Sequence, residues 1–106
     1  MSRGEVYLCT FKAPDKPRPV VILTRNEFIP RLNSVTVAPI TTTVRWIPSQ
    51  VILNQEDGVS EICAVNLHNV QTVPKQRIQS GGPITVLPSE KMAAVARALR
   101  FALDLG

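Results

Sequence analysis

The chain has 106 residues, of which 44% are hydrophobic and 19% charged, a composition typical of one ordinary globular domain spanning residues 1–106. This composition excludes a disordered tail or a collagen-like chain. The apolar runs fall far short of the roughly 18 residues that a membrane-spanning helix needs, and no signal peptide is apparent, so we expect a cytoplasmic protein without membrane contacts. In that compartment, Cys9 and Cys63 are expected to be small buried residues rather than a disulfide.

Positive charge is concentrated in the first half of the chain. The formal net charge is +4, and residues 1–50 carry seven Lys or Arg against three acids, whereas residues 51–106 carry five of each. An excess of this size on half of a small domain suits a polyanion such as nucleic acid, although a modest net charge often serves only solubility. Charge alone therefore leaves an anionic ligand and a solvated surface equally open.

Short apolar runs separated by Pro or Gly predict a small β-barrel or sandwich. Residues 12–17 are predicted to form a charged loop, and residues 26–33 a short helix or turn. A turn is also expected at Asp57 and Gly58. Strands are expected, in chain order, at residues 6–11, 19–24, 34–41, 51–54, 62–73 and 84–87.

Two irregularities are predicted within these strands. Pro39 cannot donate a backbone hydrogen bond, so we expect it to confine the end of its strand to an edge or a bulge. In the run 62–73, the alternation of apolar residues slips at His68 and Asn69. Because such a slip moves every later side chain to the other face of the strand, it predicts a bulge there.

The last part of the chain changes to helical spacing. Ser89 is predicted to cap a helix, with Glu90 favourably placed in its first turn. Apolar residues then recur at intervals of three and four and predict one buried helix face, made of Met92, Val95, Ala96, Leu99 and Leu103. Five or six short strands and one terminal helix together predict an open barrel of the SH3-like kind.

Most common catalytic sites do not fit the sequence. One His, two Cys and scattered acids lack the spacing of metal ligands, so no metal is expected. The pair Gly81–Gly82 is followed by Pro83 rather than by the residues of a phosphate-binding loop. A Ser-His-acid hydrolase is weakly supported, because no nucleophile elbow lies near His68.

Arg18 is unusual because it lies between Pro17 and Pro19. The following proline disfavours helical backbone at Arg18 and makes an extended conformation the expected one. A guanidinium on such a stiff stem loses little entropy on binding, and its planar donors fit phosphate oxygens. The alternative is an ordinary surface arginine with a solvated head.

Three consecutive threonines end the third predicted strand. Strand alternation places Thr41 and Thr43 on one face and Thr42 on the other. A threonine hydroxyl can donate a hydrogen bond to a phosphate or to an attacking oxygen. Threonine is also simply a favourable strand residue, so this run alone is a weak signal.

Short motifs follow one another along the chain: RGEVY at residues 3–7, RPVVIL at 18–23, VAPIT at 37–41, and QTV with KQRI at 71–73 and 75–78. In this order, and with a terminal helix, they resemble the MazF/PemK toxins of bacterial toxin–antitoxin pairs over nearly the whole chain. The stretches PVVILTRN and NSVTVAPITTTVR are most similar to the mycobacterial branch of that family.

The resemblance implies a barrel like that of MazF and CcdB toxins, a homodimer, and metal-independent, sequence-specific cleavage of single-stranded RNA without a cofactor. It implies products with 2′,3′-cyclic phosphate and 5′-hydroxyl ends, inhibition of translation and growth, and neutralisation by a cognate antitoxin whose extended tail covers the RNA groove. The family's catalytic arginine falls on Arg18 and its catalytic threonine on Thr41.

The chain also departs from the family pattern. Its loop between the first two strands is shorter than in many relatives, so Asp15 is the acid that the loop offers. Gln71 stands where many relatives carry a basic residue. Arginine has a pKa above about 12, so it stays charged at neutral pH and is a poor acid or base. His68, a residue type that titrates near neutral pH, is a second acid–base candidate, although a lone strand histidine is more often structural.

Further RNA contacts are expected from polar, basic and aromatic side chains near these positions. Trp46 can stack on a base or pack against the antitoxin or a second subunit, and Arg25 is either a phosphate contact or a solvated side chain. The expected RNA-binding residues are Lys16, Arg25, Thr43, Arg45, Trp46, Asn69 and Gln71.

Two rival functions remain open at this point. The first is a growth inhibitor on the same fold that binds nucleic acid or gyrase without cutting. The second is a regulator that binds its own operator, although a basic half-domain does not by itself supply a base-reading helix. A hydroxyl paired with a rigid arginine favours cleavage over either alternative.

Overall fold

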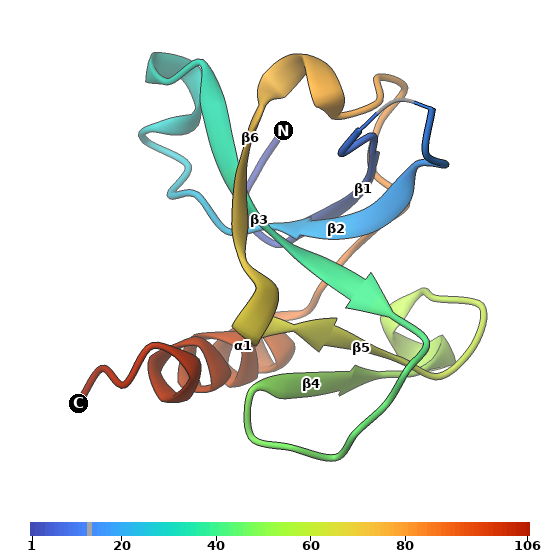
Figure 1. The fold of residues 1–106 in the computed structure, drawn as a ribbon, viewed down its shortest axis with the longest axis vertical. Helices are drawn as coiled ribbons and strands as arrows, with labels where there is room; N and C mark the ends of the chain where they lie inside the picture. The colour runs from blue at the N-terminus through green and yellow to red at the C-terminus, as the bar shows by residue number, and fades with distance from the viewer. Residues whose placement is uncertain (13) are drawn as a thin grey trace.

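A computed structural model describes residues 1–12 and 14–106 of the chain. Among these residues, seven strands form one sheet in the order β4-β5-β3-β2-β1-β7, and β6 pairs with β3 beside this path (Figure 1). The strands are β1 (Glu5–Cys9), β2 (Arg18–Ile22), β3 (Ser34–Thr41), β4 (Gln50–Leu53), β5 (Cys63–Asn66), β6 (Gln71–Pro74) and β7 (Thr85–Val86). The helices are the 3-10 turns η1 (Ile29–Arg31), η2 (Gln55–Asp57), η3 (Leu67–Asn69) and η4 (Lys75–Arg77), and the helix α1 (Ser89–Ala102).

β3 is the strand that joins the two halves of the sheet. Along one edge it pairs antiparallel with β2, from Val37 to Pro39. Along the other edge it pairs first with β6 and then, at Ile40 and Thr41, with β5. Figure 1 shows β3 running from the β1–β2 half of the molecule to the β4–β5 half. The result is the mostly β, curled half-barrel with a C-terminal helix that the sequence predicts.

Pro39 lies within β3 at a place where only one side of the strand is paired, so the predicted edge position is confirmed locally. It pairs with Val20 of β2 on one side. On the other side, the pairing with β6 ends at Val37 and the pairing with β5 begins at Ile40. A proline has no backbone N–H to donate. The strand accommodates it at the point where one neighbour has ended and the next has not begun.

The predicted strand 62–73 is divided into β5, the turn η3 and β6. Ile40 pairs with Val65 and Val37 pairs with Gln71, so three residues of β3 correspond to six residues of the facing chain. The three extra residues form η3. The discontinuity predicted at His68 and Asn69 is therefore present, but it is a full 3-10 turn rather than a bulge.

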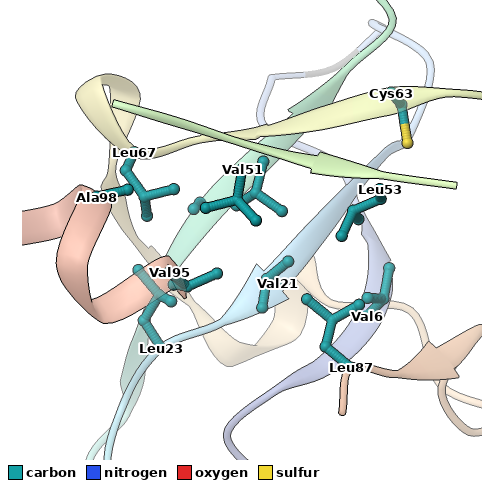
Figure 2. Close-up of a cluster of buried hydrophobic side chains, with 12 residues drawn as sticks. Val6, Val21, Leu23, Val51, Leu53, Cys63, Leu67, Leu87, Val95 and Ala98 are labelled. Atoms are coloured by element: carbon teal, nitrogen blue, oxygen red, sulfur yellow. The ribbon is translucent and has the colours of Figure 1, made fainter. Parts of the chain in front are cut away.

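The hydrophobic core has two parts, one on each face of β2. Val21 and Leu23 belong to a cluster covered by α1, and Figure 2 shows Leu53 and Val95 among its members. Val20 and Ile22 belong to a second cluster that includes Val35 and other residues of β3. Because successive strand residues point to opposite faces, a strand buried on both sides reads as the continuous apolar run seen in this sequence. As predicted, both cysteines are buried and unpaired.

α1 packs on the first cluster with a narrower face than predicted. Val95 and Ala98 are buried, and Met92 and Leu99 are partly buried against the same cluster. Leu103 lies beyond the end of the helix and is 56% exposed, so its predicted place on the buried face is wrong. Ser89 is the first residue of the helix; the N-cap is Pro88, and no side chain caps the helix. Within the part of the chain that the structure describes, no helix is long and apolar enough to span a membrane.

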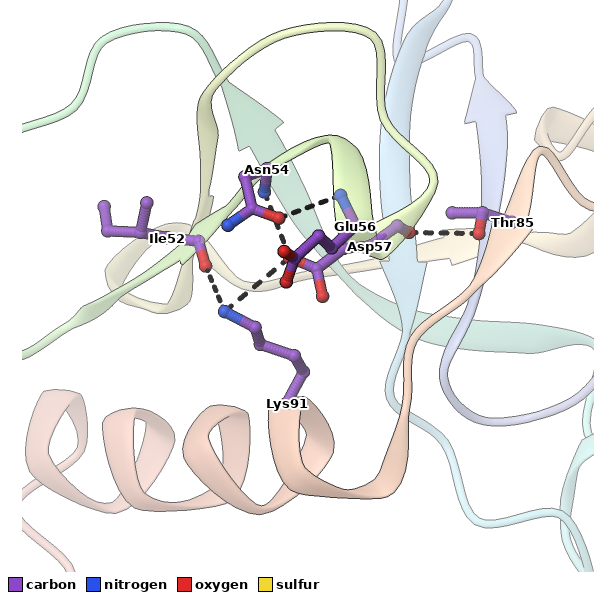
Figure 3. A network of polar contacts seen from close by, with 6 residues as sticks. All are labelled: Ile52, Asn54, Glu56, Asp57, Thr85 and Lys91. Atoms are coloured by element: carbon purple, nitrogen blue, oxygen red, sulfur yellow. Dashed lines mark hydrogen bonds and ion pairs between the residues drawn. The ribbon is translucent and has the colours of Figure 1, made fainter.

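A polar network ties the β4–β5 loop to α1 and β7 (Figure 3). The carboxylate of Asp57 is buried; its Oδ2 accepts a hydrogen bond from Asn54 N at 3.0 Å and lies 3.6 Å from Lys91 Nζ. Lys91 Nζ also donates to the carbonyl of Ile52 at 2.9 Å. The hydroxyl of Thr85 donates to the carbonyl of Asp57 at 3.1 Å. These bonds fix the start of the loop whose later residues line the main cleft.

Gly58 has a φ of +88° and faces Thr85 at the end of this network, where an added Cβ would overlap the Thr85 hydroxyl. We expect Gly58→Ala to lower the free energy of unfolding by about 2 kcal/mol, because left-handed backbone strain adds to the overlap. Gly81 is the matched control, since its φ is +105° and nothing lies within 4 Å of an added Cβ. Gly81→Ala should cost about 1 kcal/mol, from backbone strain alone. Equal losses in urea unfolding would contradict the steric argument.

Candidate functional site

A cleft lies where β2 begins and β3 ends, beside the β4–β5 loop. It has a volume of about 600 Å³ and is open to solvent. Its lining includes Arg18, Thr41 and residues 58–61 of the β4–β5 loop. Apolar side chains such as Leu8 and Ile40 contribute to its lining. The cleft therefore combines an apolar surface with a few polar groups, as ligand sites commonly do.

Arg18 and Thr41 reach the same cleft because of the register between β2 and β3. The pairing of the two strands ends at Val20 and Pro39. Arg18 lies two residues before Val20, and Thr41 lies two residues after Pro39. Residues two apart share a face of a strand, so the register places Arg18 and Thr41 across from each other where the strands separate. Arg18 is exposed, and Thr41 is half-buried. The sequence predicted both residues as a pair, and the structure brings them to one cleft.

The Thr41 hydroxyl has a backbone partner. Thr43 N donates a hydrogen bond to Thr41 Oγ1 at 3.1 Å. A hydroxyl can accept two hydrogen bonds and donate one, so the Thr41 proton is left to donate elsewhere. β3 ends at Thr41, and Thr43 lies beyond it, so the predicted alternation of Thr41 and Thr43 along one strand is wrong. Thr42, rather than Thr43, lines the cleft.

Three further polar residues line the cleft, and two of them, Glu61 and Asn66, were not predicted from the sequence. Glu61 is on the β4–β5 loop, Asn66 ends β5, and Asn69, which was predicted, ends η3. Glu61 supplies a carboxylate, and the two asparagines supply amide donors and acceptors. Glu61 and Asn66 reach the cleft only because β5 pairs with β3, a long-range contact that no local sequence signal announces.

Cys63 also lines the cleft, but as a neutral thiol. Burial raises its pKa, and the negative charges of Glu61 and Asp57 raise it further. A thiolate is the nucleophilic form of cysteine, and a raised pKa keeps that form scarce at neutral pH. Cys63 is therefore a packing residue rather than a nucleophile.

The two acid–base candidates from the sequence are outside the lining of this cleft. Asp15 is exposed between β1 and β2, where its backbone N–H donates to Lys12 O at 2.8 Å. His68 is exposed on η3, and its Nδ1 forms a 2.7 Å hydrogen bond with the hydroxyl of buried Ser49. Both remain predictions, and Glu61 is the carboxylate that the cleft itself provides.

The other predicted RNA contacts lie outside the lining of this cleft. Arg25 lies in a separate pocket with Arg3 and Asn26. Trp46 is 76% exposed and has a φ of +55°, which is unusual for a residue other than glycine. Four further predicted contacts are exposed on the surface outside the cleft: Lys16, Thr43, Arg45 and Gln71. Across residues 1–12 and 14–106, no three His, Cys, Asp or Glu side chains gather as a metal site would require.

Known proteins of similar sequence are bacterial toxins. Residues 2–103 match the family model described as PemK-like, MazF-like toxin of type II toxin-antitoxin system. Endoribonuclease MazF3 of Mycobacterium tuberculosis is 42% identical over 91 residues, which cover 86% of each chain. Probable endoribonuclease MazF5 of the same species is 38% identical over 104 residues, which cover 97% of this chain and 93% of that protein.

Solved structures give the same result. Mycobacterium tuberculosis toxin MazF-mt6 matches with a TM-score of 0.85 and 37% identity, over 96% of this chain and 98% of that one. An endoribonuclease from a mycobacterial species, solved in complex with its cognate antitoxin, matches with a TM-score of 0.87 and 27% identity, over 100% of this chain and 97% of that one.

These comparisons confirm the family and the mycobacterial branch that the sequence motifs indicated. The relatives are named endoribonucleases, which is the activity expected from the motifs. The half-barrel with its C-terminal helix is the fold of these toxins. The chain belongs to the PemK-like, MazF-like toxins of type II toxin–antitoxin systems.

Proposed function

We propose that the chain is an endoribonuclease toxin that cleaves single-stranded RNA at specific sequences, without a metal, to leave 2′,3′-cyclic phosphate and 5′-hydroxyl ends. The observation that carries the proposal is the presence of Arg18 and Thr41 in one solvent-open cleft. Cleavage of RNA in the cytoplasm would inhibit translation and growth. The family match and the endoribonuclease relatives support the reaction class.

In this reaction the phosphorus is transferred from the 5′-oxygen of one nucleotide to the 2′-oxygen of the preceding ribose. The ribose 2′-oxygen attacks the phosphorus, its proton passes to a base, the bond to the 5′-oxygen breaks, and that oxygen takes up a proton. Negative charge grows on the nonbridging oxygens in the transition state, and preorganised donors stabilise it there. Arg18 supplies a cationic planar donor, and Thr41 supplies the proton that its bond from Thr43 leaves free.

Glu61 is the base that this cleft offers for the 2′-hydroxyl proton. Among the described residues that line the cleft, it is the only one with a carboxylate. Glu61 belongs to the β4–β5 loop, whereas Arg18 and Thr41 belong to β2 and β3, so the proposed general base and the proposed phosphate contacts come from two parts of the fold. Asn66 and Asn69 add amide groups suited to hydrogen-bond an unstacked RNA base.

A cognate antitoxin and a second copy of the chain are the proposed protein partners. One mycobacterial relative was solved with its antitoxin, which supports a similar complex here. An acidic antitoxin segment lying over the cleft would compete with RNA for Arg18. Large apolar side chains are exposed near the C-terminus, at Phe101, Leu103 and Leu105, and a second subunit would cover such a surface.

The test is to incubate the purified protein with a pool of random RNA in excess chelator and to map the released ends. We expect 2′,3′-cyclic phosphate and 5′-hydroxyl ends within a short sequence motif, and no cleavage when the ribose at that motif is 2′-deoxy. The 2′-deoxy substrate lacks the attacking group but keeps the phosphate. Intact RNA with binding retained would instead favour the non-cleaving inhibitor.

A further inference from the structure

The side chain of Gln50 connects the interior of the fold to the loop that follows β3. Gln50 is the first residue of β4 and is only 8% exposed. Its Oε1 accepts a hydrogen bond from Arg45 N at 2.8 Å, and its Nε2 donates to Thr43 O at 3.2 Å. Both ends of one buried amide thus hold the same short loop.

The loop held by Gln50 in turn holds Thr41. Thr43 is bound to Gln50 through its carbonyl and to the Thr41 hydroxyl through its N–H. Gln50 Nε2 also lies 3.5 Å from Oδ1 of Asn66, which lines the cleft. A continuous set of contacts therefore leads from the buried amide to two residues of the cleft.

Burial of this amide is better explained by the loop than by packing. An amide taken out of water destabilises the fold unless its polar atoms are paired. Val51, the next residue of β4, belongs to the hydrophobic cluster, and successive strand residues point to opposite faces, so the side chain of Gln50 lies away from that cluster and does not serve its packing. The polar partners of Gln50 in the loop are exposed residues, Thr43 and Arg45, which water could otherwise satisfy.

We propose that Gln50 is a positioning residue for Thr41, and this inference rests on the proposed ribonuclease function. By fixing Thr43, Gln50 keeps the Thr43 N–H on one acceptor site of the Thr41 hydroxyl, so that the hydroxyl proton is directed to the scissile phosphate. Without Gln50, the loop moves and the hydroxyl samples other orientations. Misplacement of a catalytic group by about 1 Å can cost up to about a hundredfold in rate.

A double-mutant cycle with Gln50→Met and Thr41→Val tests the proposal. Methionine keeps the length of the side chain and removes both polar ends. Single-turnover cleavage at saturating protein should be about tenfold slower in Gln50→Met. In the Thr41→Val background, Gln50→Met should cause no further loss, because the residue through which it acts is already gone.

Hydrogen exchange of the Thr43 amide gives a second readout that does not depend on catalysis. It should become faster in Gln50→Met, because the loop opens more readily. Thr24→Val is the matched control: Thr24 Oγ1 accepts a hydrogen bond from Thr36 N at 2.8 Å, away from the cleft. Thr24→Val also removes a hydrogen bond between a side chain and the backbone, as Gln50→Met does, and it should leave the cleavage rate within twofold of wild type.

The outcomes separate the inference from the function. A tenfold loss in both backgrounds, or an unchanged rate in Gln50→Met, overturns the role of Gln50 while cleavage itself stands. If wild type does not cleave RNA, both proposals fall. If Gln50→Met does not fold, Gln50→Glu replaces it, since a carboxylate keeps the acceptor for Arg45 N and loses the donor to Thr43. Full activity in Gln50→Glu then overturns the inference.

Discussion

Replacing Arg18 by alanine is expected to slow RNA cleavage by at least about a hundredfold, because one transition-state donor typically contributes a factor of 10² to 10³. The side chain is exposed and lines the open cleft, so its loss should leave the fold intact. Cleavage should be measured under single-turnover conditions, with thermal unfolding as the check on folding. A variant that keeps near-native activity would remove Arg18 from the mechanism.

Two further variants separate charge from geometry at this position. Arg18→Lys keeps the charge but loses the planar pair of donors, and we expect it to recover only a small part of the rate. Arg100→Ala removes one positive charge from an exposed position on α1, outside the cleft. It should cleave at nearly the wild-type rate. If Arg100→Ala and Arg18→Ala lose activity equally, the effect is general electrostatics and not a specific contact.

Arg18 could be found from the sequence because its signal is local. Two prolines fix its backbone, and the same feature opens β2 at the edge of the cleft. Ser34–Thr41 was also predicted with its observed bounds, since a run rich in β-branched residues is a local pattern as well. Both predictions depended on interactions between neighbours in the chain, which a single sequence displays directly.

The remaining residues of the cleft depend on contacts that are distant in the sequence. Glu61 and Asn66 reach the site because the β4–β5 hairpin pairs with β3, and nothing near either residue specifies that pairing. The same limit explains η3. The apolar pattern of residues 62–73 indicated an interruption of the strand, but its length of three residues follows only from the pairing of β5 and β6 with β3. The predicted cap at Ser89 is displaced by one residue, because the carbonyl of Pro88 accepts the first helical hydrogen bond, from Met92 N, and Ser89 therefore lies inside the helix.

Loss of the buried carboxylate at Asp57 is expected to have the largest effect on stability. Asp57→Ala leaves the Lys91 ammonium and the Asn54 N–H without their buried acceptor, and removal of one partner from such a pair costs several kcal/mol. Because the Lys91 side chain is 28% exposed, water recovers part of this loss, and we expect a decrease of about 3 kcal/mol in the free energy of unfolding. That is a large part of the 5 to 15 kcal/mol that stabilises a typical domain.

Urea unfolding of Asp57→Ala, Asp57→Asn and Glu56→Ala separates the two contributions of this carboxylate. Asp57→Asn keeps an oxygen for Asn54 N and loses only the charge facing Lys91, so it should cost about 1 kcal/mol. Glu56→Ala removes a neighbouring acid that is exposed, and it should change the free energy by less than about 0.5 kcal/mol. If Asp57→Ala is no more destabilising than Glu56→Ala, the network does not hold the β4–β5 loop. The cleft wall that carries Glu61 would then need another anchor.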